Sequence, residues 1–195
     1  GEMLSSTPLT LAETASVFGE MLTFKKMLEN AKDQNERKVL LAGKVEDMIN
    51  TVIRQIAFYD FECKLHEARK AGELTPDDIN ALWMSVQGES LGPAFEFMDG
   101  YETFWAYIPH FVHSPFYVYA YAFGDGLVNA LYAVYEAAPD GFQEKYFDML
   151  KAGGSQHHKD LLAPFGLDAS DPTFWQQGLS MISSMIDELE AMETP

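Results

Sequence analysis

The sequence predicts an all-α fold, because strand-like alternation is almost absent and helix start and stop signals recur along the chain. Apolar residues repeat in steps of three and four, and proline, glycine or a capping residue separates one run from the next. We expect about six to seven helices, one of them very long, in a single helical domain over residues 1–195. Of these 195 residues 47% are hydrophobic, which suffices for a packed core without disulfides.

The first predicted helix opens at Thr10 and continues through Phe24 with one apolar face. Glu13 and Glu20 lie seven residues apart on it, so both carboxylates point to the same side. A helix with two stacked acids beside small residues suits a partner that favours negative charge. Thr10 and Glu13 also have the spacing of a capping box, in which Glu13 would only satisfy the first amide groups of the helix. The helix pattern leaves both interpretations open.

The longest helix is predicted from Asn35 to Ala71, because its apolar residues keep helical steps for about thirty residues without a proline. Gly72 ends it, after two basic residues in the last turn. Elsewhere the chain shows a start signal before each periodic run, and residues 94–109 are aromatic and irregular. These signals predict helices over Thr75–Glu89, Ser114–Ala137 and Ser155–Leu162, a helix between the Pro139–Gly141 break and the glycine pair Gly153 and Gly154, and a last helix from Ser170 onward.

Charge, cysteine content and hydropathy exclude several classes of partner. A formal net charge of -17 argues against nucleic acid or an anionic membrane surface as the main partner. No apolar run reaches transmembrane length. Cys63 is the single cysteine, so no intrachain disulfide can form, and we expect a cytoplasmic protein.

Three of the five histidines show no pattern of a metal site. His66 is followed by a glutamate, but Lys70 stands where the second histidine of an HExxH zinc helix would be. We interpret His66 as a solvated helix residue. His157 and His158 are adjacent and point apart on a helix, so they are interpreted as a surface pair.

His110 and His113 lie in a segment bounded by prolines, directly before a tyrosine-rich helix with Tyr117, Tyr119 and Tyr121. Tyrosine hydroxyls stay protonated at neutral pH and can donate to a developing oxyanion. Alternatively the aromatic helix is simply core, with its hydroxyls directed at solvent or backbone. The residues alone do not decide between a catalytic cluster and a core.

Several segments together resemble oligoendopeptidase F, of the thimet oligopeptidase group of zinc metallopeptidases. The resemblance covers essentially the whole chain and implies the C-terminal helical part of a zinc oligopeptidase. It divides the chain into a zinc-ligand helix and turn, residues 1–35, and a substrate-facing part, residues 36–195. The segments that carry it are 11–20, 108–110, 114–122, 161–167 and 171–175.

The resemblance also implies roles for individual residues. In this family, zinc is bound by two histidines of an HExxH helix and by a glutamate on the next helix, which corresponds to Glu13. Glu20 then orients a zinc histidine through its ring N–H. The implied substrate contacts are His110 for the peptide backbone and Tyr119 for the oxyanion, with Tyr117 and His113 beside them.

The sequence departs from the family pattern because it contains no HExxH motif. We expect that motif upstream of Gly1, in an N-terminal part of the same protein, and we interpret the chain as a fragment of a larger peptidase. The intact enzyme would use zinc to cleave short peptides, whereas this chain alone would hold zinc weakly or not at all and be inactive. The alternative is a non-catalytic helical module that binds a peptide or protein. Apolar surface left uncovered could also drive self-association.

Overall fold

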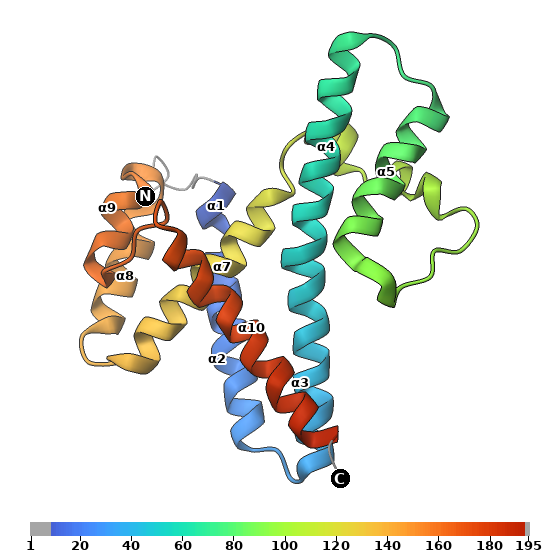
Figure 1. Cartoon of the computed structure of the whole chain (residues 1–195). Helices are drawn as coiled ribbons and strands as arrows, with labels where there is room; N and C mark the ends of the chain where they lie inside the picture. The colour runs from blue at the N-terminus through green and yellow to red at the C-terminus, as the bar shows by residue number, and fades with distance from the viewer. Residues whose placement is uncertain (1–8, 194–195) are drawn as a thin grey trace. The chain divides into compact units, whose positions relative to one another are not determined.

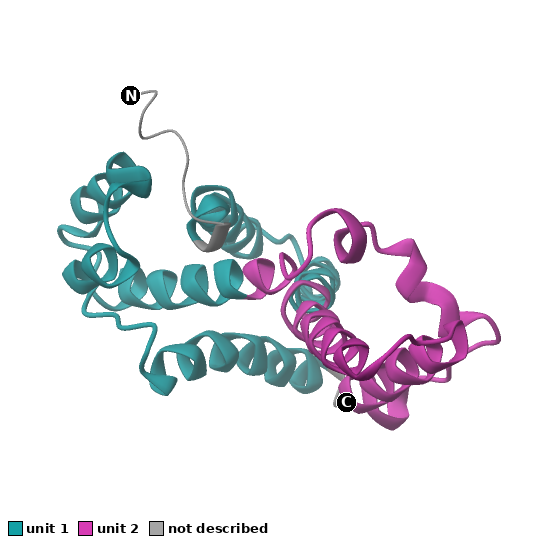
Figure 2. Cartoon of the chain, turned by 90° about the horizontal axis from the view of Figure 1, so that it is seen from above, with its two compact units in different colours: residues 1–48, 123–195 teal, residues 49–122 magenta. Residues whose placement is uncertain are grey.

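The computed structural model describes residues 9–193, and none of these residues forms a strand. The predicted all-α fold is therefore confirmed. The chain divides into two compact units, one of residues 1–48 and 123–195 and one of residues 49–122 (Figure 2). The prediction of a single domain with a boundary near residue 35 stays a prediction. None of the helices within residues 9–193 is both long and apolar enough to span a membrane.

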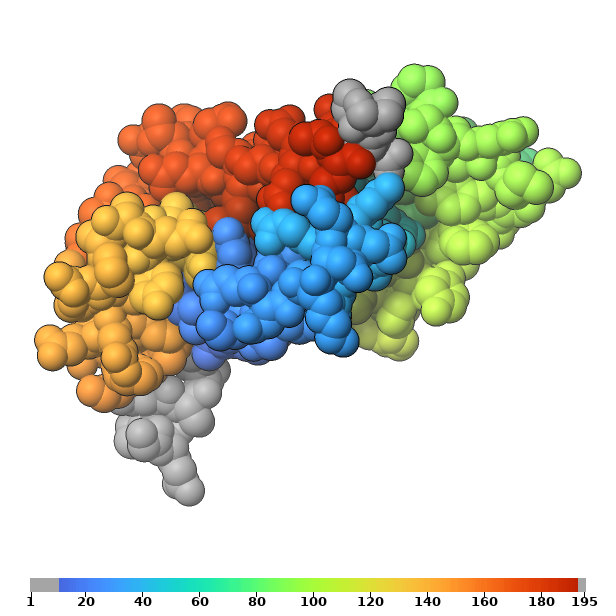
Figure 3. Space-filling model, turned by 90° about the horizontal axis from the view of Figure 1, so that it is seen from below, coloured from blue at the N-terminus to red at the C-terminus, as the bar shows by residue number. Residues whose placement is uncertain are grey.

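The first unit is a set of helices around an aromatic and aliphatic core. The ring of Phe18 lies 4.6 Å from that of Tyr146 and 5.7 Å from that of Phe142. The C-terminal helix α10 packs along α3, and its red surface lies beside the blue surface of α2 and α3 (Figures 1 and 3). The elements of this unit are α1 Leu9–Ala12, α2 Thr14–Glu29, α3 Gln34–Met48, most of α7 Tyr119–Ala137, α8 Phe142–Ala152, η5 Gly153–Ser155, α9 His158–Leu162, η6 Ala163–Phe165 and α10 Pro172–Glu193.

The second unit is built on two helices, α4 and α5, that lie side by side (Figure 1). Its core surrounds Phe61 and Trp83, whose rings meet edge to face at 5.3 Å. The Trp83 indole N–H donates to the Tyr101 carbonyl at 3.0 Å, which fastens the aromatic segment to α5. The elements are η2 Ile49–Ile53, α4 Arg54–Ala71, α5 Pro76–Leu91, η3 Gly92–Ala94, η4 Tyr101–Tyr107 and α6 His110–His113.

The long helix predicted from Asn35 to Ala71 is present as α3, η2 and α4 in succession. Its middle, η2, is a π-helical turn rather than an α-helical one. Thr51, Val52 and Ile53 are β-branched, and such residues crowd an α-helix. A periodicity of 3.6 residues does not reveal the wider turn.

The helix starts differ in how well the sequence predicted them. Thr75 and Asp78 form a capping box at the start of α5, as its sequence indicated. The helix expected from Ser114 begins only at Tyr119, because Phe116 has a left-handed backbone with φ 59° that interrupts a helix. The capping residue of α9 is His157 rather than Ser155, because the His157 ring accepts from the Lys159 amide.

Candidate active site

The second unit brings His110 together with two of the tyrosines that follow it. Phe111 carries this segment into the core, with its ring 5.2 Å from Phe61 and 5.7 Å from Phe58. His110, the first residue of α6, is thereby fixed at the edge of the core. The Tyr121 hydroxyl lies 3.3 Å from His110 Nε2.

Tyr117 completes the cluster. Its ring stacks on the His110 ring at 5.6 Å and 28°, and it meets the Tyr121 ring at 5.3 Å. All three side chains are half-buried, so they combine a fixed position with access to solvent. One imidazole and two phenols are therefore in mutual contact in the second unit.

The other two predicted residues of this segment lie apart from that contact. Tyr119 is 39% exposed, and its ring meets Tyr59 at 5.5 Å. The His113 side chain is exposed, on the last residue of α6. The sequence did not define a role for Tyr121. Tyr121 follows His110 by eleven residues, and the turn between α6 and α7 brings the two side chains together.

That turn contains a strained residue. Phe116 is the only non-glycine residue with positive φ among residues 9–193. The left-handed conformation costs a bulky side chain about 1–2 kcal/mol, so packing or hydrogen bonding must hold it. The Phe116 ring lies 4.8 Å from His66 and 6.1 Å from Tyr59, and its amide donates to Glu62 Oε1 at 2.8 Å. The chain between His110 and Tyr121 thus has a defined path.

Glu13 lies in the first unit, at the residue between α1 and α2 where the predicted helix is interrupted. Its side chain is half-buried, and Glu13 Oε2 accepts from the Ser16 hydroxyl at 3.4 Å. The Glu13 side chain makes no capping bond at the start of α2. The side chain of Thr10, the other half of the predicted capping box, lies outside the described residues.

Glu20 has a partner within the chain. Its carboxylate accepts from Lys44 Nζ at 2.5 Å, and Lys44 also pairs with Asp47 at 3.3 Å. Burial lowers the pKa of Lys44, but the hydrogen bonds and charges of Glu20 and Asp47 outweigh it, so this pKa is raised. Lys44 is therefore a buried cation that its two carboxylates keep charged.

Asp125 of α7 is a buried carboxylate near this cation. Burial raises its pKa to about 6, against the lowering effects of the Lys44 charge and of a hydrogen bond from Asn129. The Asn129 amide donates to Asp125 Oδ2 at 2.8 Å. None of the predicted roles includes this residue, and the two flanking glycines were its only sequence signal.

A zinc site is implied by the family resemblance but does not fit the residues described here taken alone. A catalytic zinc ion needs three protein ligands. Within residues 9–193, no three His, Cys, Asp or Glu side chains are grouped so that they could hold a metal ion. Glu13 can offer one carboxylate, and further ligands would have to come from other residues.

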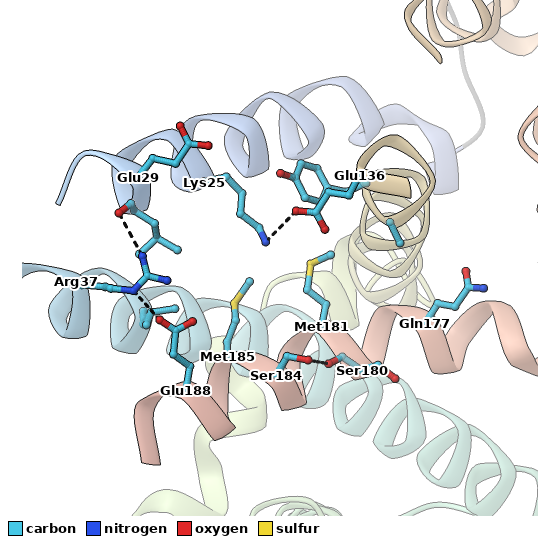
Figure 4. Close-up of a pocket in the computed structure, with 14 residues that line it drawn as sticks. Lys25, Glu29, Arg37, Glu136, Gln177, Ser180, Met181, Ser184, Met185 and Glu188 are labelled. Atoms are coloured by element: carbon cyan, nitrogen blue, oxygen red, sulfur yellow. Dashed lines mark hydrogen bonds and ion pairs between the residues drawn. The ribbon is translucent and has the colours of Figure 1, made fainter. Parts of the chain in front are cut away.

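A cavity of about 420 Å³ lies in the first unit between α2, α3, α7 and α10 (Figure 4). Lys25 and Arg37 are its two basic lining residues, and each is paired with a carboxylate. Lys25 Nζ lies 3.3 Å from Glu136, and Arg37 Nε lies 2.6 Å from Glu188. None of the predicted site residues lines this cavity.

Comparisons with known proteins show which family this sequence belongs to. The sequence model of peptidase family M3 matches residues 3–181 of this chain. The chain is 32% identical over 186 residues to the plasmid oligoendopeptidase F of Lactococcus lactis subsp. cremoris, covering 95% of this chain and 31% of that protein. It is 31% identical over 183 residues to oligopeptidase PepF of Bacillus subtilis, and this match covers 93% of this chain and 27% of that protein.

A solved structure gives the same result. The crystal structure of oligoendopeptidase-F from Enterococcus faecium superimposes with a TM-score of 0.84 at 27% identity, covering 95% of this chain and 36% of that one. The chain thus spans about a third of the length of the relatives that it matches. Because the family match extends over most of the sequence, the chain belongs to peptidase family M3.

Proposed function

We propose that the chain forms the substrate-facing, C-terminal part of a zinc-dependent oligoendopeptidase that hydrolyses internal bonds of short peptides. The observation that carries the proposal is the cluster of His110, Tyr117 and Tyr121 in a chain of peptidase family M3. The activity belongs to the longer protein, since the chain spans about a third of its relatives. A cytoplasmic location is consistent with the lone Cys63.

In this proposal the second unit handles the peptide. The His110 ring N–H donates to a backbone carbonyl of the substrate, and the contact with Tyr121 orients the ring. Tyr119 donates to the carbonyl oxygen as negative charge develops on it, because a phenol is a protonated donor at neutral pH. Tyr117 and His113 line the path of the substrate. The exposure of Tyr119 gives its hydroxyl room to meet a ligand.

The test uses the longer enzyme with single hydroxyl deletions. Tyr119→Phe should lower kcat by about 10²- to 10³-fold with little change in KM, as the loss of an oxyanion donor does. Tyr107→Phe is the matched control, since Tyr107 is 83% exposed and outside the cluster. Equal effects of Tyr119→Phe on kcat and KM, or no effect, would contradict the assignment of the oxyanion role.

The metal role of Glu13 is likewise a proposal. Glu13 supplies one zinc ligand and Glu20 helps to orient another, with the remaining ligands contributed by the rest of the protein. The isolated 195-residue chain should then bind no stoichiometric zinc and cleave no peptide. Metal analysis after dialysis against zinc, together with a peptide cleavage assay, checks this. Stoichiometric zinc with turnover would refute it.

Two further experiments test self-association of the isolated chain and the alternative of a non-catalytic binding module. Large apolar side chains such as Phe95, Met98 and Val112 are exposed, so the isolated chain should self-associate at high concentration, which light scattering measures. A binding module would hold peptides in the longer protein without cleaving them. Turnover by the longer protein supports the peptidase, and binding without turnover supports the module.

A further inference from the structure

Glu62 of α4 is a buried carboxylate without a role in the function proposed above. It is 1% exposed, which is unusual for an acid, because a buried charge must be compensated. Burial raises the pKa of the Glu62 carboxyl above its ordinary value, because it outweighs the lowering effects of the hydrogen bond from the Phe116 amide and of His66 and His110. Its Oε1 accepts from the Phe116 amide at 2.8 Å, and its Oε2 is buried without a hydrogen-bond partner.

The residue that Glu62 holds is the strained one. Phe116 adopts φ 59°, and its amide is directed at the carboxylate from a position 54 residues further along the chain. A carboxylate is a stronger acceptor than a neutral oxygen, so this bond suits a backbone that must be kept in an unfavourable conformation. Around it, the Phe116 ring rests on His66 and Tyr59.

The segment after this anchor carries the cluster. Tyr117 follows Phe116 directly and stacks on His110. The Tyr121 amide donates to the Val118 carbonyl at 3.2 Å, which continues the backbone from the anchor into the first turn of α7. A change in the backbone at Phe116 would therefore redirect Tyr117, Tyr119 and Tyr121 together.

We propose that Glu62 is a positioning residue, whose carboxylate fixes Phe116 in its left-handed conformation and thereby holds Tyr117 and Tyr121 against His110 and sets the direction of Tyr119. Glu62 touches no reacting group in this arrangement and acts through the backbone of the segment. The inference rests on the proposed function of the tyrosines, and its experiment has a structural readout that does not depend on that function.

The first readout is amide hydrogen exchange of Phe116 in the 195-residue chain, followed by NMR. Glu62→Leu removes the acceptor and should accelerate exchange at Phe116 by at least about tenfold. Glu62→Gln keeps an acceptor oxygen of the same shape and should retain most of the protection. Glu67→Gln is the control, since Glu67 is an exposed acid on the same helix, paired with Lys70. Unchanged exchange in Glu62→Leu overturns the proposal.

The second readout is the kinetics of the longer enzyme. Glu62→Leu should lower kcat by at least about tenfold while KM stays within about twofold, and Glu62→Gln should restore most of kcat. If Glu62→Leu does not fold, replacement of Phe116 by its α-hydroxy analogue deletes the amide donor alone, and the same loss of kcat is expected. A loss of protection at Phe116 with unchanged kcat overturns the positioning role. Failure of the proposed function would appear separately, as full activity of Tyr119→Phe.

Discussion

At the scale of single residues, the chain contains a buried acid whose ionisation opposes folding. Asp125 is 3% exposed, and burial raises its pKa from 3.8 to about 6. Because the folded-state pKa is above the unfolded one, the unfolded chain loses this proton first as pH rises. The resulting penalty is absent below about pH 4 and complete above about pH 6, where it amounts to about 3 kcal/mol.

Asp125→Asn should remove this penalty, since the amide oxygen can still accept from Asn129. We expect the stability of the variant relative to the wild type to increase by about 2 kcal/mol between about pH 4.5 and about pH 7.5. Urea unfolding at the two pH values measures the change. Asp148→Asn, at an exposed ion pair with Lys151, should show no such increase. A pH-independent difference for Asp125→Asn would contradict the raised pKa.

At the scale of elements, two helices of the first unit approach closely at glycines. A Cβ added at Gly126 of α7 would lie 2.9 Å from the Trp175 ring. A Cβ added at Gly178 of α10 would lie 3.4 Å from the Gly126 backbone. Glycine at these positions therefore permits the contact between α7 and α10, which a glycine within a helical pattern does not reveal by itself.

Gly126→Ala should destabilise the chain by about 1–2 kcal/mol, because overpacking against Trp175 outweighs the gain of about 1 kcal/mol in helix propensity. Gly124→Ala is a matched control in the same helix. Its added Cβ would meet the Glu13 side chain at 3.7 Å, an ordinary contact, so that variant should be neutral or slightly more stable. Thermal and urea unfolding of both variants compare them. An equal response would show that the Trp175 ring yields without cost.

The elements also show where sequence reasoning succeeded. The cap at Thr75 and the apolar period of the long helix predicted α5 and the span of α3 to α4, because these signals act within a few residues. The start of α7 was missed because Phe116 owes its conformation to contacts with α4. No local rule predicts a left-handed phenylalanine.

At the scale of the whole molecule, the dominant property is charge. Acidic residues number 30 against 13 basic ones, so mutual repulsion acts against the folded state at low ionic strength. Raising NaCl from about 0.02 M to about 0.5 M shortens the screening length from about 20 Å to about 4 Å. We expect this salt change to raise Tm.

A charge-reduced variant tests the cause of this salt effect. Glu46→Gln, Glu73→Gln and Glu144→Gln combined change three exposed acids and bring the formal charge from -17 to -14. This triple variant should show a higher Tm at low salt and a weaker rise with NaCl than the wild type. A fall in Tm with NaCl would mean that surface ion pairs, such as Lys26 with Glu29, outweigh the repulsion.

By itself, the sequence determined the helical class, most helix spans and the family resemblance, since periodicity, caps and motifs are local properties. The resemblance to oligoendopeptidase F was confirmed by the family match. Only the tertiary structure decided that Tyr121 meets His110, that Glu62 reaches Phe116 and that Asp125 is buried. These features depend on which side chains packing brings together and removes from water. The roles of Glu13, Glu20, His110 and Tyr119 stay predictions for the longer enzyme.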